Sequence, residues 1–268
     1  MQKNKKMFSA ILLSTAMILS GCTTGSQSIK NGQSNSSGQG KNSGQSSGKN
    51  QSDYVVDESD YVNAKNLIAN IERKNLSEAE KAGLIQMREE EKLARDVYNF
   101  LYKRWEQNIF ANIAKSEQTH TDSIKVLLDN YGIADPSSDD TLGVFTSAEM
   151  QSLYKELVEK GSNSLADALA IGATVEDLDI KDLEDLIEVT DNEDIKIVYQ
   201  NLMKGSRNHL RAFVRQIERI GGSYSPQYIS QEEYQSIIDS EQEKGNANSS
   251  ATTGGGMNSS AGGKNSRK

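Results

Sequence analysis

Apolar side chains recur every three or four residues along four long stretches of the chain, which is the spacing of amphipathic α-helices. The stretches cover residues 78–105, 110–131, 165–187 and 193–220. The third reads as one helix or as two in line. Glycines fall mainly between the stretches, and the chain has only two prolines. The pattern therefore predicts an all-α fold built on four long helices.

Local signals mark where these helices begin and end. Ser77 to Glu80 form a capping box before the first stretch, Gly132 closes the second, and Thr190 to Glu193 are predicted to open the fourth. The second and third stretches are joined by a long connection with its own short helix, predicted from the Thr146 to Glu149 box to Gly161. Four long helices with one long crossover predict a bundle.

Polar side chains interrupt the apolar stripes at inward positions. They are Glu91 in the first helix, Glu117 and His120 in the second, Glu176 in the third and His209 in the fourth. An unpaired carboxylate in a low-dielectric core is costly, so Glu in three of four stripes calls for a shared neutralising partner. The chain has only two histidines, and both fall on these seams. A cation between the helices would supply the neutralising charge.

Spacing supports a metal site. Glu117 and His120 are three residues apart and therefore point to the same side of their helix. Carboxylate oxygen and imidazole nitrogen together suit iron, manganese or zinc. Structural roles without a metal stay open. Glu176 would be a residue at the rim of the bundle, His209 would donate to a buried carbonyl, and the Glu117/His120 pair would form a salt bridge with an arginine.

Three segments carry a resemblance to known proteins: EEEKLARDVY at 89–98, SEQTH at 116–120 and GSRNHLRAF at 205–213. The arrangement resembles the ferritin-like superfamily, whose di-iron or di-manganese sites use Glu from two helices and Glu-x-x-His from the other two. More narrowly, residues 76–240 resemble the bacterial and archaeal domain-of-unknown-function 2202 family. The resemblance implies a ferritin-like four-helix bundle that binds one or two iron or manganese ions. The implied ligands are Glu91, Glu117, His120, Glu176 and His209.

The sequence departs from the superfamily pattern at Ser206, where the glutamate of the second Glu-x-x-His would stand. Serine is a poor ligand for these metals, so three carboxylates and two imidazoles remain. Asp179, three residues after Glu176, is a candidate substitute. The neighbouring Gly205 and Ser206 are small and leave room for water, a small ligand or a close helix contact.

The N-terminus has the pattern of a signal peptide, with three lysines before an apolar run at 7–19 that is too short to span a membrane. The run ends in Leu19-Ser20-Gly21-Cys22, which resembles the bacterial lipoprotein box. The resemblance implies removal of residues 1–21 and attachment of acyl chains such as palmitate to Cys22. It places the protein at the extracytoplasmic face of the cell membrane.

Composition divides the remaining chain. Residues 22–53 are rich in Gly, Ser, Asn and Gln and predict a flexible linker, and a similar composition predicts a disordered tail at 244–268. Residues 54–243 then form one helical domain. Glu89, Glu90 and the acidic run at 177–188 are interpreted as solvated surface.

The net charge of −8 argues against nucleic acid as a partner, because phosphate binding depends on clustered Lys and Arg. Loss of residues 1–21 removes three lysines and no acids, which makes the net charge −11. Such a charge repels anionic lipid, so membrane attachment would depend on the acyl chains.

Three functions remain open on the sequence alone. One is a ferroxidase- or peroxidase-like oxidoreductase that uses Fe or Mn and acts on O2 or peroxide. The second is a non-catalytic protein that scavenges a divalent ion. The third is a metal-free helical interaction module. Self-association into a homodimer is also left open.

Overall fold

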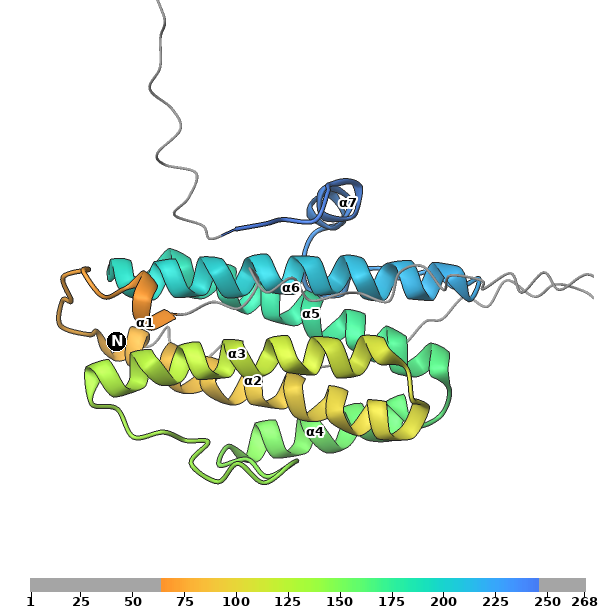
Figure 1. Ribbon diagram of the computed structural model, residues 1–268, viewed down its shortest axis with the longest axis horizontal. Coiled ribbons are helices and arrows are strands. Elements are labelled where there is room, and N and C mark those ends of the chain that lie inside the picture. The colour runs from red at the N-terminus through yellow and green to blue at the C-terminus, as the bar shows by residue number, and fades with distance from the viewer. Residues whose placement is uncertain (1–63, 246–268) are drawn as a thin grey trace, which may run out of the picture.

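The computed structural model describes residues 64–245, which form seven helices and no strand (Figure 1). The predicted all-helical class is confirmed for this part of the chain. Residues 1–21, Cys22, the linker at 22–53 and the tail from 246 lie outside the described residues and stay predictions. The helices are α1 (Ala64–Leu67), α2 (Glu78–Trp105), α3 (Asn108–Tyr131), α4 (Ala148–Gly161), α5 (Leu165–Val189), α6 (Glu193–Arg219) and α7 (Gln231–Asp239).

The predicted helix ends are partly confirmed. Ser77 and Glu80 form both hydrogen bonds of the capping box at α2, and Gly132 ends α3 with φ 66°. The third stretch is one unbroken helix, α5. The N-cap of α4 is Ser147 instead of the predicted Thr146, because the Ser147 hydroxyl accepts the amide of Met150.

The predicted capping box at the start of α6 is wrong. Thr190 is the C-cap of α5, and Asn192 is the N-cap of α6. The Thr190 hydroxyl donates to Glu80, which also accepts from Asn192 Nδ2 at 2.9 Å. A contact with the distant α2 therefore replaces the local box. The short helices α1 and α7 were not predicted, since each is too short to show a helical period.

The four long helices lie side by side in two antiparallel pairs, α2 with α3 and α5 with α6 (Figure 1). Short connections at 106–107 and 190–192 join the members of each pair. Trp105 Nε1 at the end of α2 donates to Gly161 O just before α5, while Glu80 at the start of α2 bonds the end of α5. The connection at 132–164, which carries α4, therefore makes α5 antiparallel to α2.

Two separate apolar clusters make up the core of the described domain. One contains Leu101, Phe110 and Phe213 and extends to α4 and α7, and the other contains Leu84, Ile124 and Leu186 at the opposite end of the long helices. Along their helices, Glu91, Glu117, His120 and His209 lie between these clusters, whereas Glu176 on α5 is flanked by Val175 and Ile180 of the first cluster. The apolar packing at both ends thus fixes the positions of the polar side chains between them.

Some acids interpreted as solvated are buried. Asp177 is 0 % exposed and its carboxylate accepts the backbone amides of Gln227, Tyr228 and Ile229. Glu89 accepts two amides at the start of α4. These acids hold loops against the long helices, and their partners are far away in sequence.

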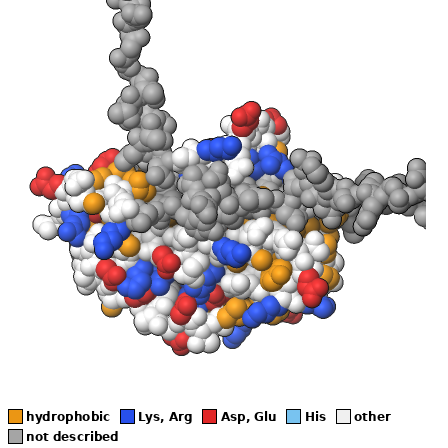
Figure 2. Space-filling model, in the orientation of Figure 1, with side chains coloured by type: hydrophobic (Ala, Val, Ile, Leu, Met, Phe, Trp, Pro, Cys, Tyr) orange, Lys and Arg blue, Asp and Glu red, His pale blue; other side chains and the backbone are white. Residues whose placement is uncertain are grey.

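The surface of the domain is mixed in charge. Acidic and basic side chains are interspersed on the face shown in Figure 2, whereas both histidines are buried. None of the helices within 64–245 has the length and apolar character needed to cross a membrane.

Candidate metal centre

The five predicted site residues converge from four helices. Glu91 comes from α2, Glu117 and His120 from α3, Glu176 from α5 and His209 from α6, and each is at most 2 % exposed. The structure therefore brings together every residue that interrupts an apolar stripe. None of the five is a rim residue.

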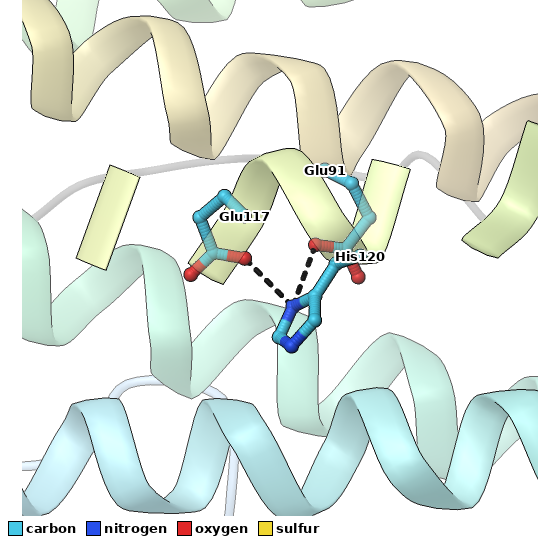
Figure 3. Close-up of side chains that lie close together, drawn as sticks. All are labelled: Glu91, Glu117 and His120. Carbon is cyan, nitrogen blue, oxygen red and sulfur yellow. Dashed lines mark hydrogen bonds and ion pairs between the residues drawn. The ribbon is translucent and has the colours of Figure 1, made fainter. Parts of the chain in front are cut away.

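The first half of the centre contains Glu91, Glu117 and His120, which point toward one another (Figure 3). His120 Nδ1 lies 2.8 Å from Glu117 Oε2 and 3.2 Å from Glu91 Oε2. The potential ligand atoms of these three side chains all lie within 4.8 Å of one another.

The second half repeats this arrangement with Glu117, Glu176 and His209. His209 Nδ1 lies 2.8 Å from Glu117 Oε1 and 3.3 Å from Glu176 Oε2. The two imidazole rings are stacked with centroids 5.6 Å apart. Glu117 thus directs one carboxylate oxygen into each half, as a carboxylate shared by two ions would.

Neighbouring side chains orient the second half. Tyr98 donates its hydroxyl to Glu176 Oε1 at 2.5 Å, and Ser116 Oγ lies 3.0 Å from His209 Nε2. Hydrogen bonds of this kind fix ligand orientation around metal sites. Sequence reasoning missed Ser116, because a lone helical serine carries no signal of its own.

Gly205 on α6 makes room for the His120 ring. A Cβ atom at this position would lie 2.6 Å from both Cε1 and Nε2 of His120. A glycine inside a helix costs about 0.8 to 1 kcal/mol relative to Ala. The close contact with His120 explains why a glycine stands here. The contact was one of the roles open to Gly205 on the sequence.

The acids and bases of the centre shift one another's pKa values. Burial raises the pKa of Glu91 to about 8 and that of Glu176 to about 7, with the charge of Glu117 adding to both shifts. Burial alone would raise the pKa of Glu117, but His209 and His120 hold it well below its usual range. Burial opposes the charged form of His209, yet Glu117 and Glu176 raise its pKa to about 9. The protein side chains therefore hold protons that a cation would displace.

Two carboxylate oxygens of the centre accept no hydrogen bond from the described residues. They are Glu91 Oε1 and Glu117 Oε1, and both atoms are fully buried. The Glu117 atom has only the ion-pair contact with His209 Nδ1. Buried polar atoms in folded proteins are almost always hydrogen-bonded, so each such atom needs an explanation. A cation bound by these oxygens and the two imidazoles would satisfy both, and the donor set fits iron or manganese.

Ser206, which departs from the superfamily pattern, faces the same region. It is 0 % exposed and donates its hydroxyl to Asp179 Oδ2. Asp179 is half-buried, and its pKa is raised by burial and by the nearby charges of Glu91, Glu176 and Glu117. Asp179 therefore brings a fourth carboxylate close to the centre from α5.

Comparison with known proteins places this architecture in a family. Residues 80–241 match the family described as "Uncharacterized protein domain (DUF2202)". The chain is 60% identical over 178 residues to an uncharacterized protein, MJ0754, of the archaeon Methanocaldococcus jannaschii, and the match covers 66% of this chain and 96% of that protein. The crystal structure of that hypothetical protein is similar, with a TM-score of 0.64 over 65% of this chain and 99% of the other.

Proposed function

This chain belongs to the DUF2202 family, and we propose that it is a metal-binding protein with a ferritin-like four-helix bundle. In this proposal the centre holds two divalent ions, iron or manganese, one in each half, with Glu117 shared between them. The pairing of two similar half-sites around one carboxylate supports two ions instead of one.

Glu91 Oε1, a buried carboxylate oxygen that accepts no hydrogen bond from the described residues, carries this proposal. A metal-free interaction module would be expected to satisfy its buried polar network internally, since a partly satisfied network costs stability. Elsewhere in the same domain the buried acids Glu80 and Asp177 are fully used by hydrogen bonds. Glu90 Oε2, outside the centre, also lacks a hydrogen bond, but the centre combines such an oxygen with two imidazoles.

Charge balance favours the participation of Asp179. Three glutamates carry three negative charges against the four positive charges of two divalent ions. Asp179, held next to the centre by Ser206, supplies the fourth. Asp179 on α5 would then replace the carboxylate of the glutamate that the superfamily pattern places at position 206 on α6.

We further propose that the protein is an oxidoreductase that acts on O2 or peroxide. The bound ions would supply the redox chemistry. The residues of the chain contribute fixed positions: Tyr98 and Ser116 orient Glu176 and His209, and Gly205 admits the His120 ring. The carboxylates exchange protons for metal charge, because the raised pKa of Glu91 and of Glu176 reflects protons held in the metal-free centre.

The location of the protein is a separate proposal. Lipidation of Cys22 would tether the domain to the extracytoplasmic face of the membrane through the linker at 22–53. Mass spectrometry of the protein from membranes should find an acylated Cys22 as the first residue. A soluble mature protein that keeps residues 1–21 would overturn this proposal.

Elemental analysis of protein purified without added metal tests the central proposal. The parent should carry iron or manganese, and Glu117→Ala and His120→Ala should lose most of it. Asp122→Asn, an exposed acid on the same helix, is the matched control and should keep the parent's content. Unchanged metal content in both site variants would overturn metal binding at this centre. Oxygen and peroxide consumption by iron-loaded protein separates an oxidoreductase from a storage or scavenging protein.

A further inference from the structure

A cavity lies between α2, α4 and α5, next to the candidate metal centre. Its lining is mostly apolar and includes Leu93, Ala94, Leu157, Val175 and Leu178. Four polar residues also line it: Glu90, Thr174, Asp179 and Tyr228. Leu178, Asp179 and Tyr228 are half-buried, so the cavity reaches the surface on this side.

Asp179 connects the cavity to the centre. Asp179 lines the cavity, and its carboxylate accepts the hydroxyl of Ser206, a fully buried residue three positions before His209. Ala94, on the lining from α2, stands three residues after Glu91 and on the same face of that helix. A molecule in the cavity would therefore lie near Asp179, on the side of the centre where Ser206 takes the place of the superfamily's second Glu-x-x-His glutamate.

The size and polarity of the cavity limit what it accepts. Its interior volume is about 20 Å³. A single water needs about 10 to 15 Å³ on the same measure, so the cavity has room for a diatomic molecule but not for a larger organic substrate. Apolar cavities stay dry and bind apolar ligands, because a polar molecule there would lose its hydrogen bonds.

We propose that this cavity binds dioxygen and delivers it to the metal centre at Asp179. The inference rests on the proposed function and narrows its substrate from O2 or peroxide to O2. Peroxide fits less well, because most of the wall is apolar and its hydroxyl groups would find partners only at the polar residues of the lining. Passage of the metal ion itself also fits less well, since apolar walls offer a cation no ligands before it reaches Glu90 or Asp179.

Crystals of the metal-free protein under xenon pressure test the binding site without any metal chemistry. Xenon is an apolar probe of small dry cavities. We expect a xenon peak between Leu93, Leu157 and Leu178 in the parent. The peak should disappear in Ala94→Leu, which fills the cavity, and persist or grow in Leu178→Ala, which enlarges it.

The same two variants test delivery of oxygen. In iron-loaded protein, Ala94→Leu should slow O2 consumption, because the larger side chain occupies the cavity. Leu178→Ala should match or exceed the parent. General destabilisation would lower both rates, whereas control of access lowers only the rate of Ala94→Leu. Equal metal content and equal loading rates in the three proteins show that the centre is intact.

The outcomes separate this inference from the proposed function. A parent that binds metal but shows no xenon in the cavity would overturn the cavity proposal alone. So would an Ala94→Leu protein that consumes O2 at the parent's rate, or one in which only metal loading is slowed. A parent that binds xenon but no metal would overturn the proposed function and, with it, delivery of oxygen to a metal.

Discussion

Asp177 and Glu91 are both carboxylates buried inside the domain, at 0 % and 1 % exposure, but their surroundings differ. Asp177 accepts hydrogen bonds from the hydroxyl of Tyr224 and from the amides of Gln227, Tyr228 and Ile229. One oxygen of Glu91 contacts His120, Glu117 lies beside it, and its other oxygen accepts no hydrogen bond from the described residues. Burial of an acid therefore does not by itself mark a ligand site. The distinguishing feature is an oxygen left without a donor beside a buried imidazole.

The largest effect on stability is expected from Asp177→Ala. The substitution leaves three backbone amides without their acceptor, so we expect a loss of about 3 kcal/mol or more in the free energy of unfolding. Urea denaturation with and without added Mn²⁺ measures this loss. It should be similar in both conditions, because Asp177 holds a loop and touches no metal. A loss below about 1 kcal/mol would mean that its hydrogen bonds contribute little.

In contrast to Asp177→Ala, Glu91→Gln should lower metal affinity and leave the stability of the metal-free protein nearly unchanged. Metal affinity should fall by more than about 100-fold, since even the loss of an outer contact costs metal sites about 10- to 100-fold. The metal-free variant should stay within about 1 kcal/mol of the parent, because Glu91 already holds a proton in the metal-free centre and Gln is a neutral side chain of the same shape. Calorimetric titration and urea denaturation measure the two quantities. Unchanged affinity would remove Glu91 from the ligand set.

The two classes of acid should also differ in pH dependence. Burial raises the pKa of Glu91 from 4.5 to about 8, and His209 is raised from 6.5 to about 9 by Glu117 and Glu176 despite its burial. Between its unfolded and its folded pKa, each group binds more protons in the folded chain than in the unfolded chain. The stability of the metal-free protein therefore falls as the pH rises from about 6 to about 9.

The pKa of Glu80 is shifted in the opposite direction. Hydrogen bonds from Thr190, Ser77 and Asn192 outweigh its burial and lower its pKa to about 2. Its contribution to folding stability is therefore complete above pH 4.5 and is lost as the pH falls towards 2.

Urea denaturation of the metal-free protein across this range measures the difference. The decline above about pH 6 should be smaller in Glu91→Gln and should be reversed by saturating Mn²⁺, since bound metal replaces the protons. A metal-free stability that is constant from about pH 6 to about pH 9 would contradict the proton-holding centre.

The smallest effect is expected from Tyr98→Phe. The variant loses one hydrogen bond to Glu176 and keeps the ring packed against Phe213. We expect a change of about 1 kcal/mol in stability and a loss of less than about tenfold in metal affinity. Calorimetric titration beside Glu91→Gln checks the ranking. An equal loss in both variants would make Tyr98 as important as a ligand.

The sequence predicted much of this architecture because the decisive signals are periodic. The helical stripes located α2, α3, α5 and α6, and the residues that interrupt those stripes are the ones that meet in the centre. Local capping patterns were less reliable. Thr190 fits a capping box in isolation, but Glu80 on a distant helix bonds it instead.

The remaining features depend on contacts that a single sequence does not reveal. The partners of Asp177 come 47 to 52 residues later, so an acid that begins an acidic run within the predicted helix resembled solvated surface. The sharing of Glu117 between two histidines depends on the register of α3 against α6. The link from the cavity through Asp179 to Ser206 requires α5 and α6 to lie side by side.

Anomalous X-ray diffraction at the iron and manganese absorption edges, from crystals grown with either ion, tests the central claim most directly. The account predicts two anomalous peaks, one between Glu91, Glu117 and His120 and one between Glu117, Glu176 and His209. Glu117→Gln crystals should lose at least one of them. Metal-soaked parent crystals with no peak at either position, and with these side chains in their metal-free contacts, would contradict it.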